Sequence, residues 1–329
     1  MALIHEVAKK AGVSVATVSK ALSDKDYKIS GATRRRVLEA MEALGYAPNV
    51  LGRSLIKQKS TVLVAGFAMI NESIAGMYEA AAETGCDIIL LNAGVMVQND
   101  YLEKLKSRVV DGAIFNNLID EETLVALAKK YPLVQCGEYS AYPKAVSVSI
   151  DNEKAAYEMT ERMIIAGKRK FAFVTSGHLG AYTYTMAQER KKGLLRALEA
   201  HGLPYFPELT REFPYGDDYD GAVAIAAEYA AMPDGDRPDA VLCEQGAAGV
   251  ACINAFRGAG LAVPGDVAVA GLDDVPLNVL SLPGLTSVRH PYRAMGREAV
   301  YLLRALLEGE LDAGKHVYLD HTVTDRGSV

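Results

Sequence analysis

The apolar positions of the first 46 residues repeat with the period of three short helices. Over residues 4–11 the apolar side chains recur at intervals of three and four, so they share one helix face. Ser14 is a typical N-cap for a second helix over residues 15–22. Ser30 caps a third helix that runs to about residue 44, where Gly45 ends it.

A different pattern starts at residue 61, where short apolar, β-branched runs alternate with segments of helical period. Strands are predicted over 61–67, 86–92, 112–117, 132–137, 171–176, 240–245 and 267–274. Helices are predicted over 71–84, 121–130, 153–166 and 190–201. Unbroken apolar strands between helices indicate parallel strands that are covered on both faces. The alternation is too long for one compact sheet and predicts two α/β lobes.

The division of the chain follows from these patterns. We expect an all-α helix-turn-helix headpiece over 1–46, a hinge over 47–60 and an α/β core over 61–329. Within the core, we expect an N-lobe over about 61–149 and 285–314. A C-lobe is expected over about 150–284 and 315–329.

Charge is distributed unevenly between the two ends of the chain. Residues 1–60 hold 11 Lys and Arg against 5 Asp and Glu, whereas the remainder holds 24 against 36. A basic end on an acidic body indicates that the end contacts a polyanion. Four scattered cysteines, no signal peptide and no apolar run long enough for a membrane predict a cytoplasmic protein without a membrane span.

The spacing of small residues in the headpiece fits a helix-turn-helix. Ala8, Gly12 and Val18 supply the small contact residue, the turn glycine and the apolar core residue of this motif. The second helix then presents Val15, Ala16 and Lys20 to base edges, while Ser14 and Thr17 reach phosphates. A helical hairpin without a DNA role is the alternative for the spacing taken alone.

Longer motifs extend this similarity. The runs IHEVAKKAGVSVATVSKAL, ISGATRRRVLEAMEALGYAPN and GRSL resemble the headpiece and hinge of the LacI/GalR family of bacterial repressors. Looser matches follow in SIDNEKAA, AGLAVPGDVAVAGLDDVPL and the closing DRGS. The resemblance implies a DNA-binding regulator with a core like a periplasmic sugar-binding protein. It also implies a base-reading role for the second helix, and we assign hinge contacts with DNA to Asn49, Arg53 and Leu55, the last in the minor groove.

The resemblance further implies an effector held by the core. Arg190 and Asp273 match the family's polar contacts to a small hydroxylated molecule, and Gln245 replaces an asparagine of the family as an amide donor and acceptor. The effector is expected to be a sugar or sugar derivative. The loop after the first core strand is several residues shorter than usual, which leaves a protein partner or a non-sugar ligand as the alternative.

Other function classes find little support in the sequence. The chain has no nucleophile elbow, phosphate-binding loop or zinc-spaced histidine set, so we expect neither an enzyme nor a metal or cofactor site. A solute-binding protein with the same core is disfavoured by the headpiece. Because one headpiece covers one half-site of a near-palindromic operator, we expect a homodimer.

Overall fold

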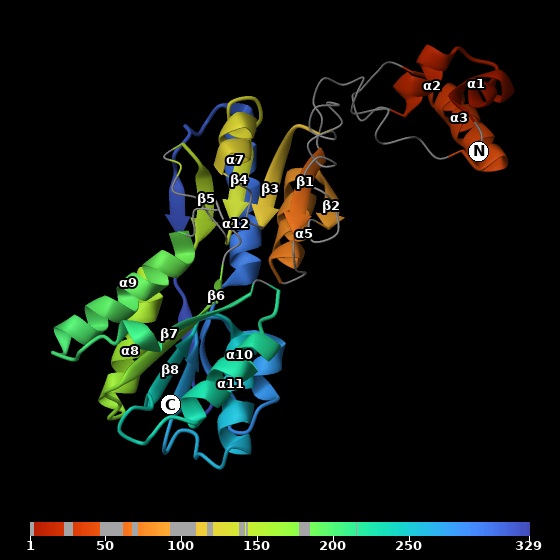
Figure 1. Cartoon of the computed structure of the whole chain (residues 1–329). Helices are drawn as coiled ribbons and strands as arrows, with labels where there is room; N and C mark the ends of the chain where they lie inside the picture. The colour runs from red at the N-terminus through yellow and green to blue at the C-terminus, as the bar shows by residue number, and fades with distance from the viewer. Residues whose placement is uncertain are drawn as a thin grey trace. The chain divides into compact units, whose positions relative to one another are not determined.

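The computed structural model describes most of the chain in two separate units. The described residues are 3–22, 29–46, 62–67, 72–92, 110–116, 121–137, 142, 144–177, 185–214 and 216–329. The contacts divide the chain into Met1–Ser60 and Thr61–Val329. Figure 1 shows the helices of the first unit and the two sheets of the second.

The first unit contains the helices α1 (Ile4–Ala11), α2 (Val15–Ala21) and α3 (Gly31–Leu44). Their apolar faces meet in one small core of Val7, Ala8, Ala11, Val18, Ala21, Val37 and Ala40. Gly12 ends α1 in the left-handed region with φ 64°, which lets the chain turn sharply into α2. The helix-turn-helix predicted from the residue spacing is therefore present.

Local hydrogen bonds define the ends of these helices. Ser30 caps α3 by accepting from the amide of Thr33, and Gly45 ends that helix with φ 58°. Leu3 precedes α1 and carries no side-chain acceptor for the cap. Instead, the carboxylate of Glu6 accepts from the Leu3 amide at 2.8 Å, which satisfies one donor at the helix start.

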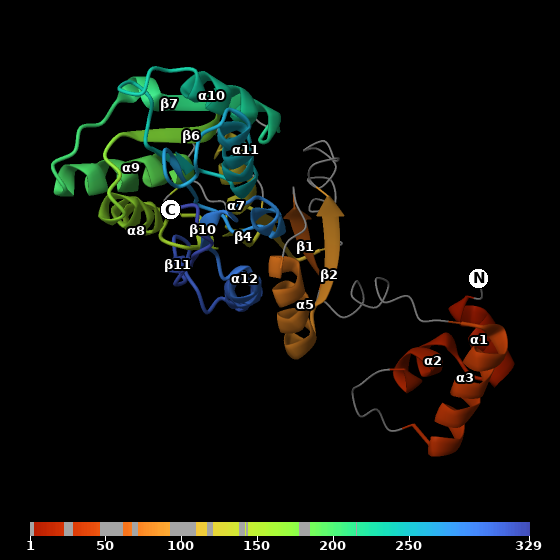
Figure 2. The same cartoon turned by 90° about the horizontal axis from the view of Figure 1, so that it is seen from below.

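The first sheet of the core is entirely parallel and has the order β11-β5-β4-β3-β1-β2. Its strands are β1 (Val62–Phe67), β2 (Asp87–Asn92), β3 (Gly112–Asn116), β4 (Leu133–Cys136), β5 (Val146–Ser149) and β11 (His316–Tyr318). Ile114 packs with helices α5 (Glu72–Thr84) and α12 (Tyr292–Glu308), which lie side by side in Figure 2. Its neighbour Phe115 packs on the opposite face with α7 (Glu121–Ala128).

The second sheet has the order β12-β10-β9-β8-β6-β7, with only β12 antiparallel to its neighbour. Its strands are β6 (Phe171–Gly177), β7 (Thr210–Pro214), β8 (Ala240–Cys243), β9 (Ala268–Gly271), β10 (Thr286–Arg289) and β12 (Thr322–Thr324). One face packs with helices α8 (Asn152–Ile165) and α9 (Thr185–Ala200), and the other with α10 (Asp220–Ala230) and α11 (Gly246–Gly258). Two short 3-10 turns, η1 (Pro207–Leu209) and η2 (Pro276–Val279), complete this lobe.

Two of the expected lobe limits need correction. Residues 285–314 are predicted to lie in the N-lobe, but β10 pairs with β9 in the second sheet, where Thr286 lies opposite Ala270. Residues 315–329 are predicted to lie in the C-lobe, but β11 pairs with β5 in the first sheet, where His316 lies opposite Ser147. β11 pairs with a strand 169 residues earlier, so local pattern gave no information on the sheet that it would join. β10 instead stays beside β9, the strand before it in the chain, and the chain crosses to the first sheet only with α12.

All four cysteines are free; Cys136, Cys243 and Cys252 are buried, whereas Cys86 is only half-buried. None of the helices in the described ranges is both long and apolar enough to cross a bilayer.

Candidate functional site

The N-terminus of α2 is built around Ser14. Its hydroxyl oxygen accepts from the amide of Thr17 at 3.1 Å and lies 2.9 Å from the Thr17 hydroxyl. Ser14 is exposed and Thr17 is half-buried. The Ser14 hydroxyl therefore caps the helix, and its contact with the Thr17 hydroxyl keeps the two hydroxyls that we expected at phosphates together in the first turn.

The outer face of α2 carries the three residues predicted to read bases. Val15, Ala16 and Lys20 are exposed, and 43% of the Val15 surface is open. Val18 is completely buried in the core between the three helices. Burial of one face therefore orients the helix and leaves its opposite face, with a basic side chain at its end, available to a major groove.

Three predicted DNA contacts belong to the hinge. Asn49, Arg53 and Leu55 lie outside the described residues. Their roles remain predictions.

The effector residues predicted in the core lie at the carboxyl ends of the second sheet. Glu244 and Gln245 follow β8, and Asp273 lies two residues after β9. Arg190 lies on α9, which follows β6. Because β6, β8 and β9 are neighbouring parallel strands, their carboxyl ends meet at one edge, where α/β proteins bind ligands.

Arg190 is buried and has partners within the protein. Its Nε donates to Oδ1 of Asn152 at 2.9 Å, at the start of α8. One terminal nitrogen donates to the Glu244 carbonyl at 3.2 Å and lies 3.4 Å from the Glu244 carboxylate. The side chains of Arg190 and Glu244 are 7% and 3% exposed. The residue predicted to bind a ligand is thus half of a buried ion pair.

Gln245 is the residue before α11 and contacts a second carboxylate. With its amide nitrogen facing Asp218, it donates to the two carboxylate oxygens at 3.0 and 2.7 Å. Burial raises the pKa of Asp218, and the charges of Glu244 and Asp217 raise it further. The side-chain amide of Gln245 therefore lies at the carboxyl end of β8 and already donates to a carboxylate of the protein, that of Asp218.

Asp273 accepts a hydrogen bond from the other lobe. The phenol of Tyr292, the first residue of α12, donates to Oδ1 of Asp273 at 2.6 Å. His290 stacks on Tyr292 with ring centroids 5.1 Å apart, and its Nε2 donates to the Leu272 carbonyl at 2.9 Å.

The same histidine connects Asp273 with Arg190. Burial lowers the pKa of His290, Asp273 acts to raise it and Arg190 acts to lower it. The charges of Arg190 and Asp273 therefore both act on this imidazole.

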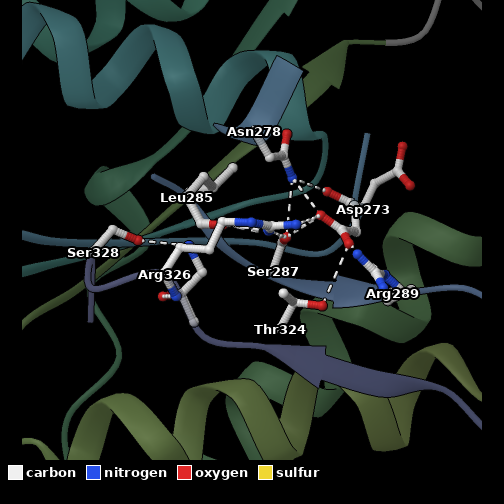
Figure 3. Close-up of polar contacts among 10 residues, drawn as sticks. Asp273, Asn278, Leu285, Ser287, Arg289, Thr324, Arg326 and Ser328 are labelled. Carbon is white, nitrogen blue, oxygen red and sulfur yellow. Dashed lines mark hydrogen bonds and ion pairs between the residues drawn. The ribbon is translucent and has the colours of Figure 1, made fainter. Parts of the chain in front are cut away.

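The neighbouring Asp274 has a structural role. Its carboxylate pairs with Arg289 and Arg326 at 2.7 Å each and accepts from the Ser287 hydroxyl at 2.9 Å. Figure 3 shows Ser287 between the two guanidinium groups, with Thr324 beside them. The side chain of Asp274 is 3% exposed. Asp274 is therefore held by two arginines, whereas the Asp273 carboxylate accepts from Tyr292.

A hollow of about 570 Å³ lies elsewhere in the core. Five carboxylates, two basic side chains, Tyr157 and Tyr318 line it against α8, α9 and β11. It includes none of the three predicted effector residues. Among the residues that the structure describes, no group of histidine, cysteine and carboxylate side chains is arranged to hold a metal ion.

Sequence reasoning missed several residues that surround Arg190 and Asp273 in the structure. Asn152, His290 and Tyr292 lie at two of the three places where the chain passes between the sheets, and Glu244 directly follows β8. Asn152 lies within the motif SIDNEKAA, but the motif alone does not indicate which side chains meet.

Comparisons with known proteins identify both parts of the chain. Residues 3–49 match the family model described as bacterial regulatory proteins, lacI family. Residues 160–329 match the periplasmic binding protein-like domain.

The similarity to individual proteins extends over nearly the whole chain. The HTH-type transcriptional repressor PurR of Photobacterium profundum is 31% identical over 92% of this chain and 91% of its own length. The solved complex of the transcriptional regulator CelR with cellobiose is 27% identical, with a TM-score of 0.72 and full coverage of both chains. The Lac repressor dimer bound to operator and the anti-inducer ONPF is 21% identical, with a TM-score of 0.84 over 99% of this chain and 98% of that one, and shares the fold.

Proposed function

The chain belongs to the LacI family of bacterial regulatory proteins, and from that premise we propose that it binds a near-palindromic operator as a homodimer under the control of a small polar effector. It is a DNA-binding transcriptional regulator and not an enzyme. We propose a repressor that acts in the cytoplasm, where its operator lies, and an effector that is a sugar or sugar derivative.

The exposed face of α2 supports the proposal that this helix binds DNA. Val15, Ala16 and Lys20 share this face above the buried Val18. An α-helix of this size fits the major groove of B-DNA, where lysine donates to the acceptors of guanine and small apolar side chains contact thymine methyl groups. Ser14 and Thr17 at the helix start then contact phosphates, which sets the register of the helix.

The hinge residues extend the proposed contact surface. Asn49 and Arg53 are assigned to polar contacts with DNA. Leu55 is assigned to the minor groove at the operator centre, where an apolar wedge unstacks a base step and bends the duplex.

An exposed apolar segment in the second lobe supports the homodimer. Val279, Leu280 and Leu282 are 60%, 74% and 71% exposed and follow one another at the end of η2. Neighbouring exposed apolar side chains commonly mark an interaction surface. We assign this surface to a second copy of the chain, since two headpieces are needed for a palindromic site.

The strand-end cluster supports the proposal for the effector. A guanidinium at Arg190, a carboxylate at Asp273 and an amide at Gln245 offer donors and acceptors that suit the hydroxyl groups of a sugar. CelR, which is similar over the full chain, binds cellobiose in its solved complex. An effector that favours one arrangement of the two lobes would shift operator affinity through that preference.

Two linked measurements test the proposed function. The full-length protein is used to select sites from a random duplex pool, and the enriched sites are expected to be near-palindromic. The selected complex is then titrated with a panel of neutral mono- and disaccharides. Arg190→Ala and Asp273→Ala are expected to lose the response of the complex to the active sugar. Enrichment of unrelated sequences contradicts the DNA proposal; normal responses from both variants contradict the effector assignment.

A further inference from the structure

The ion pair between Arg190 and Glu244 extends the proposed effector function. Arg190 brings the guanidinium that is proposed to meet the ligand, yet a carboxylate of the protein itself lies 3.4 Å from it. Both side chains are more than nine-tenths buried. A buried charge pair of this kind persists only when further hydrogen bonds hold both partners.

Glu244 has such hydrogen bonds on its other oxygen. The Thr175 hydroxyl donates to Oε2, and the amide of Ser176 donates to the same oxygen at 3.2 Å. The Ser176 hydroxyl lies 3.4 Å from it. Three donors from the end of β6 therefore hold the carboxylate on the side opposite Arg190, so that Glu244 is a fixed anion and not a mobile surface acid.

The charges around this pair are mainly negative. Asp218 lies close enough to Glu244 and to Asp217 for both charges to act on it, and burial together with these neighbours raises the pKa of Asp218. Asp273 adds a further carboxylate at the same strand edge. A second anion brought to Arg190 meets repulsion from Glu244 and finds the positive charge already compensated.

We propose that Glu244 is a specificity-determining residue that acts as an internal counter-ion of Arg190 and restricts the effector to ligands without a negative charge. Phosphorylated and carboxylated sugars are excluded, and neutral polyols are accepted. The inference depends on the proposed function, because it gives Arg190 a place in the effector site. Discrimination then arises from an unfavourable charge against the wrong ligand as well as from contacts with the right one.

Inorganic phosphate is the probe for this inference. The melting temperature of the core is measured in the full-length protein, in phosphate and in chloride at equal ionic strength. The proteins are the wild type, Glu244→Gln, Arg190→Gln and the double variant. Glu244→Gln retains the size of the side chain and removes its charge. The double variant lacks both members of the pair, so any phosphate response that it retains comes from binding elsewhere, including the basic headpiece.

The expected result is specific to one variant. Glu244→Gln is expected to gain about 2 °C in about 10 mM phosphate relative to chloride, because binding to the native state stabilises it by mass action. The wild type, Arg190→Gln and the double variant are expected to differ from one another by less than about 0.5 °C in their response. A purely structural ion pair predicts a lower melting temperature for Glu244→Gln in both salts and no response that requires Arg190.

Two results would overturn the proposal. One is a phosphate response of the wild type that is as large as that of Glu244→Gln and is lost in Arg190→Gln. The other is a folded Glu244→Gln protein without any response that depends on Arg190. If Glu244→Gln does not fold, Glu244→Asn is measured in the same four-protein design. This readout needs neither operator nor sugar, so its failure is distinguishable from the failure of the effector assignment.

Discussion

The phenol of Tyr292 donates a 2.6 Å hydrogen bond to Oδ1 of Asp273, and this bond joins the two lobes. Tyr292 begins α12, which packs on the first sheet, whereas Asp273 follows β9 of the second sheet. In the proposed site, an effector hydroxyl that donated to Asp273 would share this carboxylate with the tyrosine. The bond thus connects the proposed effector site to a helix of the other lobe.

Removing this phenol is expected to weaken the core. Tyr292→Phe leaves the ring in place but removes a hydrogen bond to a charged group, which lowers the free energy of unfolding by about 1 to 2 kcal/mol. Urea unfolding of the core transition measures the change. Tyr301→Phe is the control: its hydroxyl also donates to a carboxylate, that of Glu83, but on the exposed surface, so a loss within about 0.5 kcal/mol is expected. Equal losses of unfolding free energy in the two variants would show that the bond between the lobes stabilises the core no more than a surface hydrogen bond does.

Lys20 is expected to contribute to base preference. Lys20→Ala removes a donor from the exposed face of α2, so discrimination at one base pair is expected to fall by about 1 to 3 kcal/mol. Binding to a set of single-base operator variants measures it. Lys9→Ala, at the exposed end of α1, removes the same charge and is expected to weaken all sites equally. An unchanged preference profile in Lys20→Ala contradicts the base-reading assignment.

Asp274 is expected to dominate the acid sensitivity of the second lobe. Burial acts to raise the pKa of Asp274, but hydrogen bonds from Arg289, Ser287 and Arg326 lower it overall. Its contribution to stability is therefore complete above the unfolded pKa of about 4 and is lost as pH falls through the lower folded value.

The corresponding variant has two readouts. Asp274→Asn is expected to lose about 3 kcal/mol at neutral pH, because two arginines lose their buried partner. It is also expected to lose less stability than the wild type on acidification below pH of about 4. Asp325→Asn, which breaks an exposed pair with Arg162, is expected to change stability by less than about 1 kcal/mol. Parallel acid profiles for the wild type and Asp274→Asn would refute the assignment.

Close packing of α5 against α12 is expected to tolerate no side chain at Gly296. A Cβ there would lie 1.9 Å from the carbonyl oxygen of Ser73, a backbone atom of the other helix. Gly296→Ala is therefore expected to lower core stability by about 1 to 3 kcal/mol or more, despite the better helix propensity of alanine. Gly258→Ala, at the end of α11 with open space around it, is expected to gain up to about 1 kcal/mol. Chemical denaturation compares the two, and a gain at Gly296 would contradict the packing argument.

Elements whose causes are local could be predicted from the sequence. Ser14 and Ser30 cap the starts of α2 and α3 by accepting from the amide three residues ahead, and Gly45 ends α3 in the left-handed conformation that glycine adopts readily. Apolar runs likewise predicted seven of the parallel strands. The predicted start of α9 was wrong, because the helix begins at Thr185 and not at residue 190.

The partners of residues that are distant in sequence follow from the packed fold. β11 pairs with β5, 169 residues earlier in the chain, and no local pattern indicates that pairing. Arg190 meets a carboxylate 54 residues away, and Tyr292 meets one 19 residues away. A charged side chain in the sequence has many possible partners. Burial selects one of them, because a charge removed from water must be paired and only the packed fold determines which opposite charge lies within reach.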